Sequence, residues 1–163
     1  MSLARKTIAS PVGDLQLIAG ERGLAAILCQ HEDGARTRMS DFTEVAAHPV
    51  LDEAGRQLAE YFAGTRTRFE LPLDLRGTPF QQEVWQVLLA IPFGETRSYA
   101  AIARELGRPT AFRAVGAANG RNPLSIVAAC HRVLGTDGKL TGFAGGLAVK
   151  QHLLAHEARV LAG

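Results

Sequence analysis

A thiol, an imidazole and a guanidinium follow one another in this chain, at Cys130, His131 and Arg132. A cysteine with an ordinary pKa near ~8.5 is only a few per cent thiolate at neutral pH, and the thiolate is the nucleophile. An imidazole and a fixed positive charge beside the sulfur both favour the thiolate. The triplet therefore predicts a nucleophilic cysteine. The alternative is a core cysteine at the end of a buried strand, because cysteines are among the most buried residues.

A carboxylate that could serve this pair lies on the last predicted helix, which spans 147 to about 161. Glu157 follows Leu153 and Leu154 by four and three residues, so it falls on the apolar stripe of that helix. A carboxylate there is costly unless it has a partner, and His131 is the candidate. The alternative is a solvated Glu157 at the edge of the stripe. The residues expected to face inward are Leu147, Leu153, Leu154, Ala158 and Leu161.

The residues before the cysteine predict a helix-turn-helix. Ser98 caps a short helix over 99–106, Gly107 ends it, and a second helix runs from 111 to about 119. The second helix combines small residues with Arg113, which suits close approach to a DNA groove without reading the bases. The alternative is tight helix packing inside the protein, which small residues also serve.

The two halves of the chain differ in charge. Of the 163 residues, 1–76 carry a net charge of −2 and 77–163 a net charge of +4, with Gly77 as the expected joint. This division suggests a polyanion-binding domain beside a scaffold domain. The chain is 47% hydrophobic and 21% charged, as globular proteins are, and it has no apolar run of the ~20 residues that a membrane span needs. No signal peptide is evident and two cysteines make no disulfide framework, so we expect a cytoplasmic protein.

Apolar patterning predicts the remaining elements. The first half is expected to hold an antiparallel meander, a loop, a helix and an edge strand that Pro72 interrupts, with Cys29 in the core. In order, these are strands over 6–9, 14–19 and 24–29, a loop over 30–47, a helix over 49–62 and a strand over 69–75. The second half opens with a helix that Thr78, Pro79 and Gln81 start as a capping box. Its expected buried stripe is Phe80, Val84, Val87, Leu88 and Ile91.

Several separate motifs stand in one order along the chain. They are Phe93-Gly94-Glu95-Thr96-Arg97-Ser98-Tyr99, Arg113-Ala114-Val115-Gly116, Asn122-Pro123, Cys130-His131-Arg132-Val133, Gly145-Gly146 and Leu154-Ala155-His156-Glu157. In these motifs the chain resembles the O6-alkylguanine-DNA alkyltransferases, the methylated-DNA–protein-cysteine methyltransferases. The resemblance covers nearly the whole chain and is densest over 76–157. It implies an α/β ribonuclease-H-like domain over 1–76 and a mainly α domain over 77–163 with a winged-helix-like helix-turn-helix.

The resemblance also implies a catalytic set. Cys130 would accept the alkyl group and His131 would take its proton through a water, because neighbouring side chains point apart in extended backbone. Glu157 would orient His131 and stabilise its charged form, as in hydrolase triads. Tyr99 would bond the flipped base and help its ring to leave as a neutral species.

A second implied set binds DNA and substrate: Arg113, Ala114, Asn122, Val133, Phe143 and Ala144. Arg113 would fill the place of the flipped guanine, and Asn122 would brace the bend before the cysteine. Backbone groups near Val133 and Ala144 would hold the base. Phe143 would form a pocket wall within a loop of glycines at 135, 138, 142, 145 and 146.

The activity implied is direct DNA repair. The alkyl group of O6-alkylguanine, and less well that of O4-alkylthymine, would pass from double-stranded DNA to Cys130 as a thioether that water does not readily cleave. One molecule would act once, as a monomer, without cofactor, metal or membrane, and cooperative binding to DNA stays open. The sequence leaves the preferred alkyl size open as well.

Two residues depart from the family pattern. Ala129 stands where proline is usual, and its freer backbone is worth about 0.4–1 kcal/mol where proline fits without strain. We expect this change to slow the reaction rather than abolish it. Phe143 stands where tyrosine is common, so one pocket hydroxyl is missing.

Three rival functions remain at this point. His152 and His156 stand four apart on one helix and could bind zinc with Cys130. Cys130, His131 and Asn122 could form the triad of a thiol hydrolase, which would turn over many times. The chain could also be a DNA-binding protein without catalysis, for which Cys130 would be dispensable.

Overall fold

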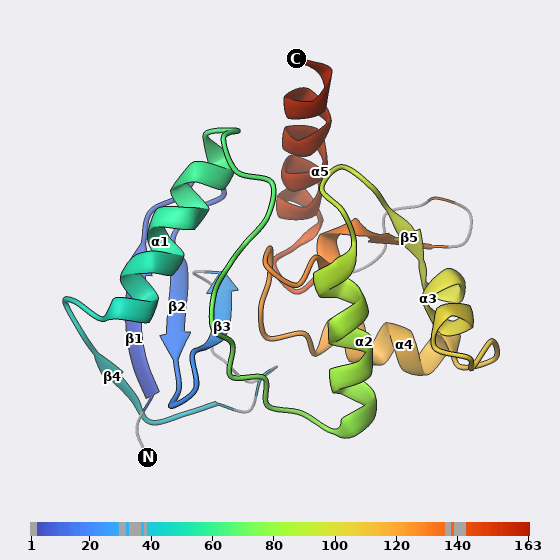
Figure 1. The fold of residues 1–163 in the computed structure, drawn as a ribbon, viewed down its shortest axis with the longest axis horizontal. Coiled ribbons are helices and arrows are strands. Elements are labelled where there is room, and N and C mark those ends of the chain that lie inside the picture. Colours follow the sequence, from blue (N-terminus) through green and yellow to red (C-terminus); the bar gives the residue numbers. More distant parts are fainter. Residues whose placement is uncertain (1–2, 30–31, 33–36, 38, 136–137, 139–142) are drawn as a thin grey trace. The chain divides into compact units, whose positions relative to one another are not determined.

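The computed structural model describes residues 3–29, 32, 37, 39–135, 138 and 143–163. It divides into two compact units, Met1–Arg76 and Gly77–Gly163. Figure 1 shows a sheet with one helix in the first unit and a mainly helical second unit.

The first unit is built on a four-stranded sheet in the order β3-β2-β1-β4. Its strands are β1 (Leu3–Ile8), β2 (Leu15–Ala19), β3 (Leu24–Cys29) and β4 (Phe42–Glu44). The first three pair antiparallel, so the predicted meander is confirmed, with Cys29 buried. The predicted loop over 30–47 is wrong at β4, which pairs parallel with β1. Residues 30–31, 33–36 and 38 of that loop lie outside the described part of the chain.

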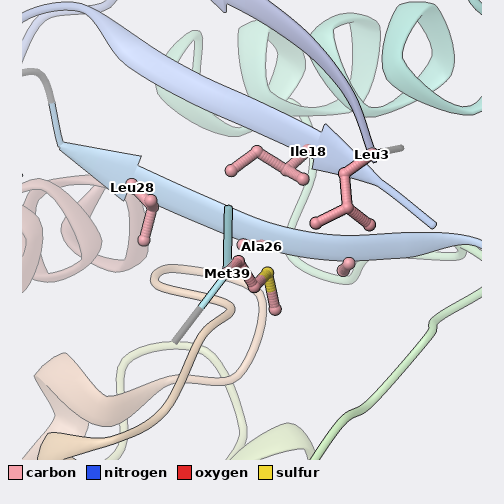
Figure 2. Close-up of a cluster of buried hydrophobic side chains, with 6 residues drawn as sticks. Leu3, Ile18, Ala26, Leu28 and Met39 are labelled. Atoms are coloured by element: carbon pink, nitrogen blue, oxygen red, sulfur yellow. The ribbon is translucent and has the colours of Figure 1, made fainter. Parts of the chain in front are cut away.

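Helix α1 (Pro49–Phe62) packs on one face of this sheet (Figure 1), as the apolar spacing predicts. His48 caps it by accepting a hydrogen bond from the Val50 N–H, and Pro49 occupies the first turn, where no intrahelical donor is needed. Away from the helix, a cluster of buried apolar side chains includes Met39 (Figure 2). Its buried members are Leu3, Ile18, Ala25, Ala26, Leu28 and Met39.

The predicted strand over 69–75 is wrong. One parallel bridge, Leu24 to Leu73, is what joins this segment to the edge of β3. Two causes are visible: Pro72 has no N–H for a ladder, and the Gln57 side chain bonds both backbone groups of Glu70. The segment therefore stays irregular, although it does lie at the sheet edge.

The second unit holds four helices in its described part. They are α2 (Pro79–Ala90), α3 (Tyr99–Glu105), α4 (Phe112–Gly120) and α5 (Leu147–Ala162). The predicted capping box of α2 and the Ser98 cap of α3 are both present. The connection between α3 and α4 spans 106–111, longer than the predicted turn, because Gly107 at φ +73° closes α3 before the chain turns. Two short strands, β5 (Arg97–Ser98) and β6 (Val133–Leu134), pair parallel.

The buried faces of α2 and α5 differ from those predicted. Trp85 is buried, with its indole N–H donating to the Ala118 carbonyl oxygen at 2.9 Å, whereas Phe80 and Val87 are only half-buried. On α5, Leu147, Ala158 and Leu161 are exposed and Leu154 is half-buried. The residues that α5 buries are Lys150, Leu153, His156 and Glu157. Polar side chains thus take the inward face of α5, and their partners belong to the candidate site.

None of the helices in the described part of the chain combines the length and apolar character of a bilayer span.

Candidate active site

Cys130 opens a short 3₁₀ turn, η1 (Cys130–Arg132), and its side chain is buried. The turn is tight: the Cys130 N–H donates to the Ala128 carbonyl at 2.7 Å and the Arg132 N–H to the Ala129 carbonyl at 3.0 Å. Cys130 is therefore not at the end of a strand, and the expected extended backbone around it is wrong. In a 3₁₀ turn, successive side chains are about 120° apart. The thiol and the imidazole of His131 still point in different directions, as the proposed bridging water requires.

The bend before the cysteine is fixed by Asn122, which is buried. Its side-chain amide donates to the Ala128 carbonyl at 2.8 Å, and its Oδ1 accepts the Leu124 N–H at 3.0 Å. Between these two points Ile126 has a φ of +76°. A β-branched residue with positive φ is strained by about 1–3 kcal/mol, so the surrounding hydrogen bonds must hold it in place.

Ala129 is anchored by a hydrogen bond that proline could not make. Its φ is −80°, which suits proline, but its N–H donates to the Leu88 carbonyl at 3.2 Å. Alanine in place of the usual proline is expected to loosen the backbone, and this hydrogen bond to the last turn of α2 offsets that effect.

Behind the cysteine, His131, Arg132 and Glu157 form a buried cluster. Glu157 Oε2 lies 2.7 Å from His131 Nε2, and Arg132 binds both carboxylate oxygens, Nε to Oε1 at 2.8 Å and Nη2 to Oε2 at 2.9 Å. The Gly94 N–H also donates to Oε1 at 2.9 Å, and Arg132 Nη1 donates to the Ile91 carbonyl at 2.6 Å. Glu157 is therefore partnered by His131, as one of the two alternatives predicts, and the alternative of a solvated Glu157 is wrong.

This cluster determines which nitrogen of His131 carries the proton. Hydrogen bonds from His131 and Arg132 outweigh burial and hold the pKa of Glu157 well below its usual range, so Glu157 is a carboxylate. Burial, which the Glu157 charge only partly opposes, lowers the pKa of His131, so its imidazole is neutral at neutral pH. A neutral ring beside a carboxylate must donate through Nε2. Nδ1 is then the acceptor, and it has no hydrogen-bond partner among the described residues although it is buried.

The rate of the alkyl transfer that the resemblance implies is expected to fall at low pH with a midpoint below 6.5, the ordinary histidine value. The neutral imidazole is the base, and its pKa in the folded protein is below the ordinary value. Single-turnover rates across a pH series test this. A midpoint above 6.5 would contradict it.

Lys150 is a second buried cation in this site, and its charge interacts with that of Cys130. The sequence predicts that Arg132 favours the Cys130 thiolate, and the structure shows its guanidinium bound to Glu157. Lys150 is fully buried and its Nζ donates to the Val133 carbonyl at 2.6 Å. Burial lowers the pKa of Lys150, and the charge of Cys130 opposes that effect. A lysine ammonium and a cysteine thiolate in this site stabilise each other.

Replacing Lys150 by methionine is expected to slow the alkyl transfer that the resemblance implies at least about tenfold, equivalent to ~1.4 kcal/mol of barrier. Methionine has similar length and no charge, so it removes the attraction that favours the thiolate. The matched control is Arg159→Met on the exposed face of the same helix. Equal single-turnover rates for Lys150→Met and the wild type would show that Lys150 does not act on the sulfur.

The other predicted site residues occupy two places. Tyr99 begins α3, and its ring lies 3.8 Å from where a Cβ on Gly116 of α4 would be. Arg113 and Ala114 are on the exposed face of α4. Val133 follows Cys130 by three residues, begins β6, and accepts a hydrogen bond from Lys150 through its carbonyl.

Phe143 and Ala144 stand just before α5, half-buried and exposed respectively. Gly142 of the same predicted loop is outside the described residues. The structure thus brings His131 and Glu157 together, with Cys130 next to His131 in the same 3₁₀ turn, and places Arg113 and Ala114 on a separate exposed face.

The histidines of the zinc hypothesis have a different setting. The His156 ring packs edge-on against Phe93, with 6.4 Å between ring centroids. Within the described part of the chain, no three histidine, cysteine or acidic side chains gather as metal ligands do.

Comparison with known proteins decides the family. Residues 3–75 match the model described as 6-O-methylguanine DNA methyltransferase, ribonuclease-like domain, and residues 79–159 match the DNA binding domain of the same family. The chain belongs to the methylated-DNA–protein-cysteine methyltransferase family. Enzymes of this family repair DNA directly by moving an alkyl group onto a cysteine. The predicted family, enzyme class and two-domain fold are confirmed.

Relatives in this methyltransferase family match along most of their length. The methylated-DNA–protein-cysteine methyltransferase of Mycolicibacterium paratuberculosis is 47% identical over 156 residues, 94% of this chain and 92% of that protein. The constitutive enzyme of Bacillus subtilis is 49% identical over 140 residues, 85% of each. Among solved structures, Mycobacterium tuberculosis OGT in complex with DNA is 45% identical with a TM-score of 0.86, covering 96% of this chain and 94% of that one.

Sequence reasoning missed Lys150 and the Gly94 N–H. Lys150 carries a weak signal: it precedes Leu153 by three residues and Glu157 by seven, so it shares their helix face. The Gly94 contact has no such signal, because a backbone donor has no side chain to single out.

Proposed function

We propose that Cys130 accepts the alkyl group of O6-alkylguanine in double-stranded DNA and that each molecule reacts once. The observation that carries this proposal is the buried cluster beside the cysteine. In it, the hydrogen bond from His131 Nε2 to Glu157 fixes the imidazole ring, so that the buried Nδ1 is the lone-pair acceptor. A base oriented by a carboxylate and placed next to a thiol is the arrangement that activates a nucleophile.

The proposed reaction uses only side chains of this protein, a water molecule and the damaged base. The Cys130 thiol gives its proton to His131 Nδ1 through a water, and the Lys150 ammonium stabilises the thiolate that forms. The thiolate attacks the alkyl carbon, a C–S bond forms and the C–O6 bond breaks, and its electron pair goes to the guanine. Tyr99 donates its hydroxyl proton to the departing ring, so that neutral guanine returns to the DNA. The product is a thioether, which no group in the cluster can cleave.

The target base must leave the duplex, because an alkyl group within the stack is out of reach, and extrusion costs a few kcal/mol. We assign the domain over 77–163 as a winged-helix-like unit in which α4 meets DNA, Arg113 fills the vacated place, and Ala114 permits close approach. Asn122 fixes the position of the cysteine relative to this unit.

Val133, Phe143 and Ala144 form the pocket for the extruded base. O4-alkylthymine is a poorer substrate than O6-alkylguanine. The domain over 1–76 serves as a scaffold. The protein acts as a cytoplasmic monomer.

Counting products tests the proposal against a thiol hydrolase. Duplex DNA with O6-methylguanine is added in increasing excess, and the repaired guanine is counted. We expect the yield to stop at one repaired base per protein molecule. A yield that keeps rising with time would overturn single-use transfer, and no yield at all would overturn transfer.

Affinity for undamaged duplex DNA is expected to fall with salt. If about five Arg or Lys side chains meet phosphates, the slope of log affinity against log salt is near ~−4. Fluorescence anisotropy over a salt series measures this slope. A flat response would argue against duplex DNA as the partner.

A further inference from the structure

Phe112 is a large apolar side chain left 46% exposed at the first position of α4. Among the described residues, Leu147 and Leu161 are the other large apolar side chains with such exposure. Of these, Leu161 packs against Gly94. Phe112 is not among the residues that α4 buries. The helix is held from its other side, by Val115, Ala118 and Asn119, and by the Trp85 indole N–H on the Ala118 carbonyl.

The surroundings of Phe112 are small or basic. Along the exposed face of α4, the residues after it are Arg113, Ala114, Ala117 and Gly120. The Arg113 guanidinium carbon lies 6.0 Å from the centre of the Phe112 ring. The face therefore carries one aromatic ring and one guanidinium side by side at its start, and bare backbone beyond them. Such a face can come close to a surface while two large side chains reach further into it.

We propose that Phe112 enters the DNA beside Arg113 and stacks on the base next to the extruded nucleotide. This inference rests on the proposed function, because it needs an extruded base. When a nucleotide leaves the stack, its neighbour exposes an aromatic face that was covered. A phenyl ring covers that face well, and apolar wedges between base steps are a recurring device of proteins that deform DNA.

The occupant of this face is duplex DNA rather than a protein partner. The residues around Phe112 match the DNA-binding domain of the family. Arg113 lies beside it, and Arg108 and Arg121 are exposed at the two ends of the same helix region. Stacking is indifferent to base identity, since every base has a π-face. A ring at this position therefore suits a protein that must act on lesions in any sequence.

The test compares Phe112→Ala and Phe112→Trp with the wild type on two substrates. One is duplex DNA with O6-methylguanine, and the other is O6-benzylguanine as the free base, which needs no extrusion. For Phe112→Ala we expect the transfer rate on limiting duplex to fall about five- to 150-fold, the range for losing one base–aromatic stack. We expect the free-base rate and the melting temperature to stay unchanged. Phe112→Trp is expected to react with the duplex at least as fast as the wild type.

Leu161→Ala, which truncates another exposed apolar side chain of the same unit, is the matched control and should keep the wild-type rate on both substrates. An unchanged duplex rate for Phe112→Ala would overturn the inference. Equal losses on duplex and free base would also overturn it, because the ring would then act on the pocket. If the wild type reacted with neither substrate, the proposed function itself would fail, which is a separate result.

Discussion

Replacing Glu157 by alanine is expected to abolish detectable alkyl transfer and to lower the free energy of unfolding by about 3–5 kcal/mol. Glu157 accepts buried hydrogen bonds from His131 and Arg132 and a half-buried one from the Gly94 N–H. Without the carboxylate, the Arg132 guanidinium is a buried charge without its counter-ion. His131 also loses the group that holds its proton on Nε2, so Nδ1 is no longer kept as the acceptor.

Urea denaturation and single-turnover rates measure the two effects of Glu157→Ala. The matched control is Glu95→Ala, which removes an exposed carboxylate paired with Arg97 in the same unit. An exposed pair contributes about 0–1 kcal/mol, so that variant should keep both its stability and its rate. A Glu157→Ala protein as stable and as fast as Glu95→Ala would show that the cluster neither holds the fold nor activates the cysteine.

Replacing Cys130 by alanine is expected to remove alkyl transfer completely while leaving affinity for duplex DNA unchanged. The sulfur is the only atom of the proposed mechanism that forms a bond to the alkyl carbon, whereas the proposed DNA contacts are made by α4 and its basic neighbours. Transfer of a radiolabelled methyl group and fluorescence anisotropy measure the two properties. This separation distinguishes repair from the rival of a DNA-binding protein without catalysis.

The chain offers its own control for Cys130→Ala. Cys29 is also buried, but it belongs to β3 of the other unit. We expect Cys29→Ala to lose some stability through the cavity it creates and to transfer the methyl group as the wild type does. Transfer that survives in Cys130→Ala, or that disappears in Cys29→Ala, would contradict the assignment of the acceptor.

Local signals in the sequence predicted most elements of the fold. The capping box at Thr78 and Gln81, the cap at Ser98 and the glycine at 107 each act within one helical turn, and each is present. Elements that depend on distant partners were predicted poorly. β4 exists because it pairs with β1, about forty residues earlier in the chain, and 69–75 fails as a strand because Gln57 binds its backbone. Neither contact can be inferred from apolar alternation.

The candidate site shows the same division. Cys130 with His131 was evident from adjacency, and Glu157 from a polar residue on an apolar stripe. The contact of Arg132 with Glu157 was not predicted, because sequence adjacency says nothing of the direction a side chain takes from a 3₁₀ turn. The exposed Leu147 and Leu161 were wrongly placed inside for a related reason: α5 turns its polar residues inward to build the site. The spacing of apolar residues alone predicts an ordinary amphipathic helix with its leucines inside.

The mass of the intact protein after incubation with duplex DNA bearing O6-methylguanine tests the central claim most directly. We predict that the polypeptide gains the mass of one methylene group per molecule, and that peptide mapping locates the gain at Cys130. An unchanged mass after the methyl group has left the DNA would contradict the account, as would a gain located at any other residue.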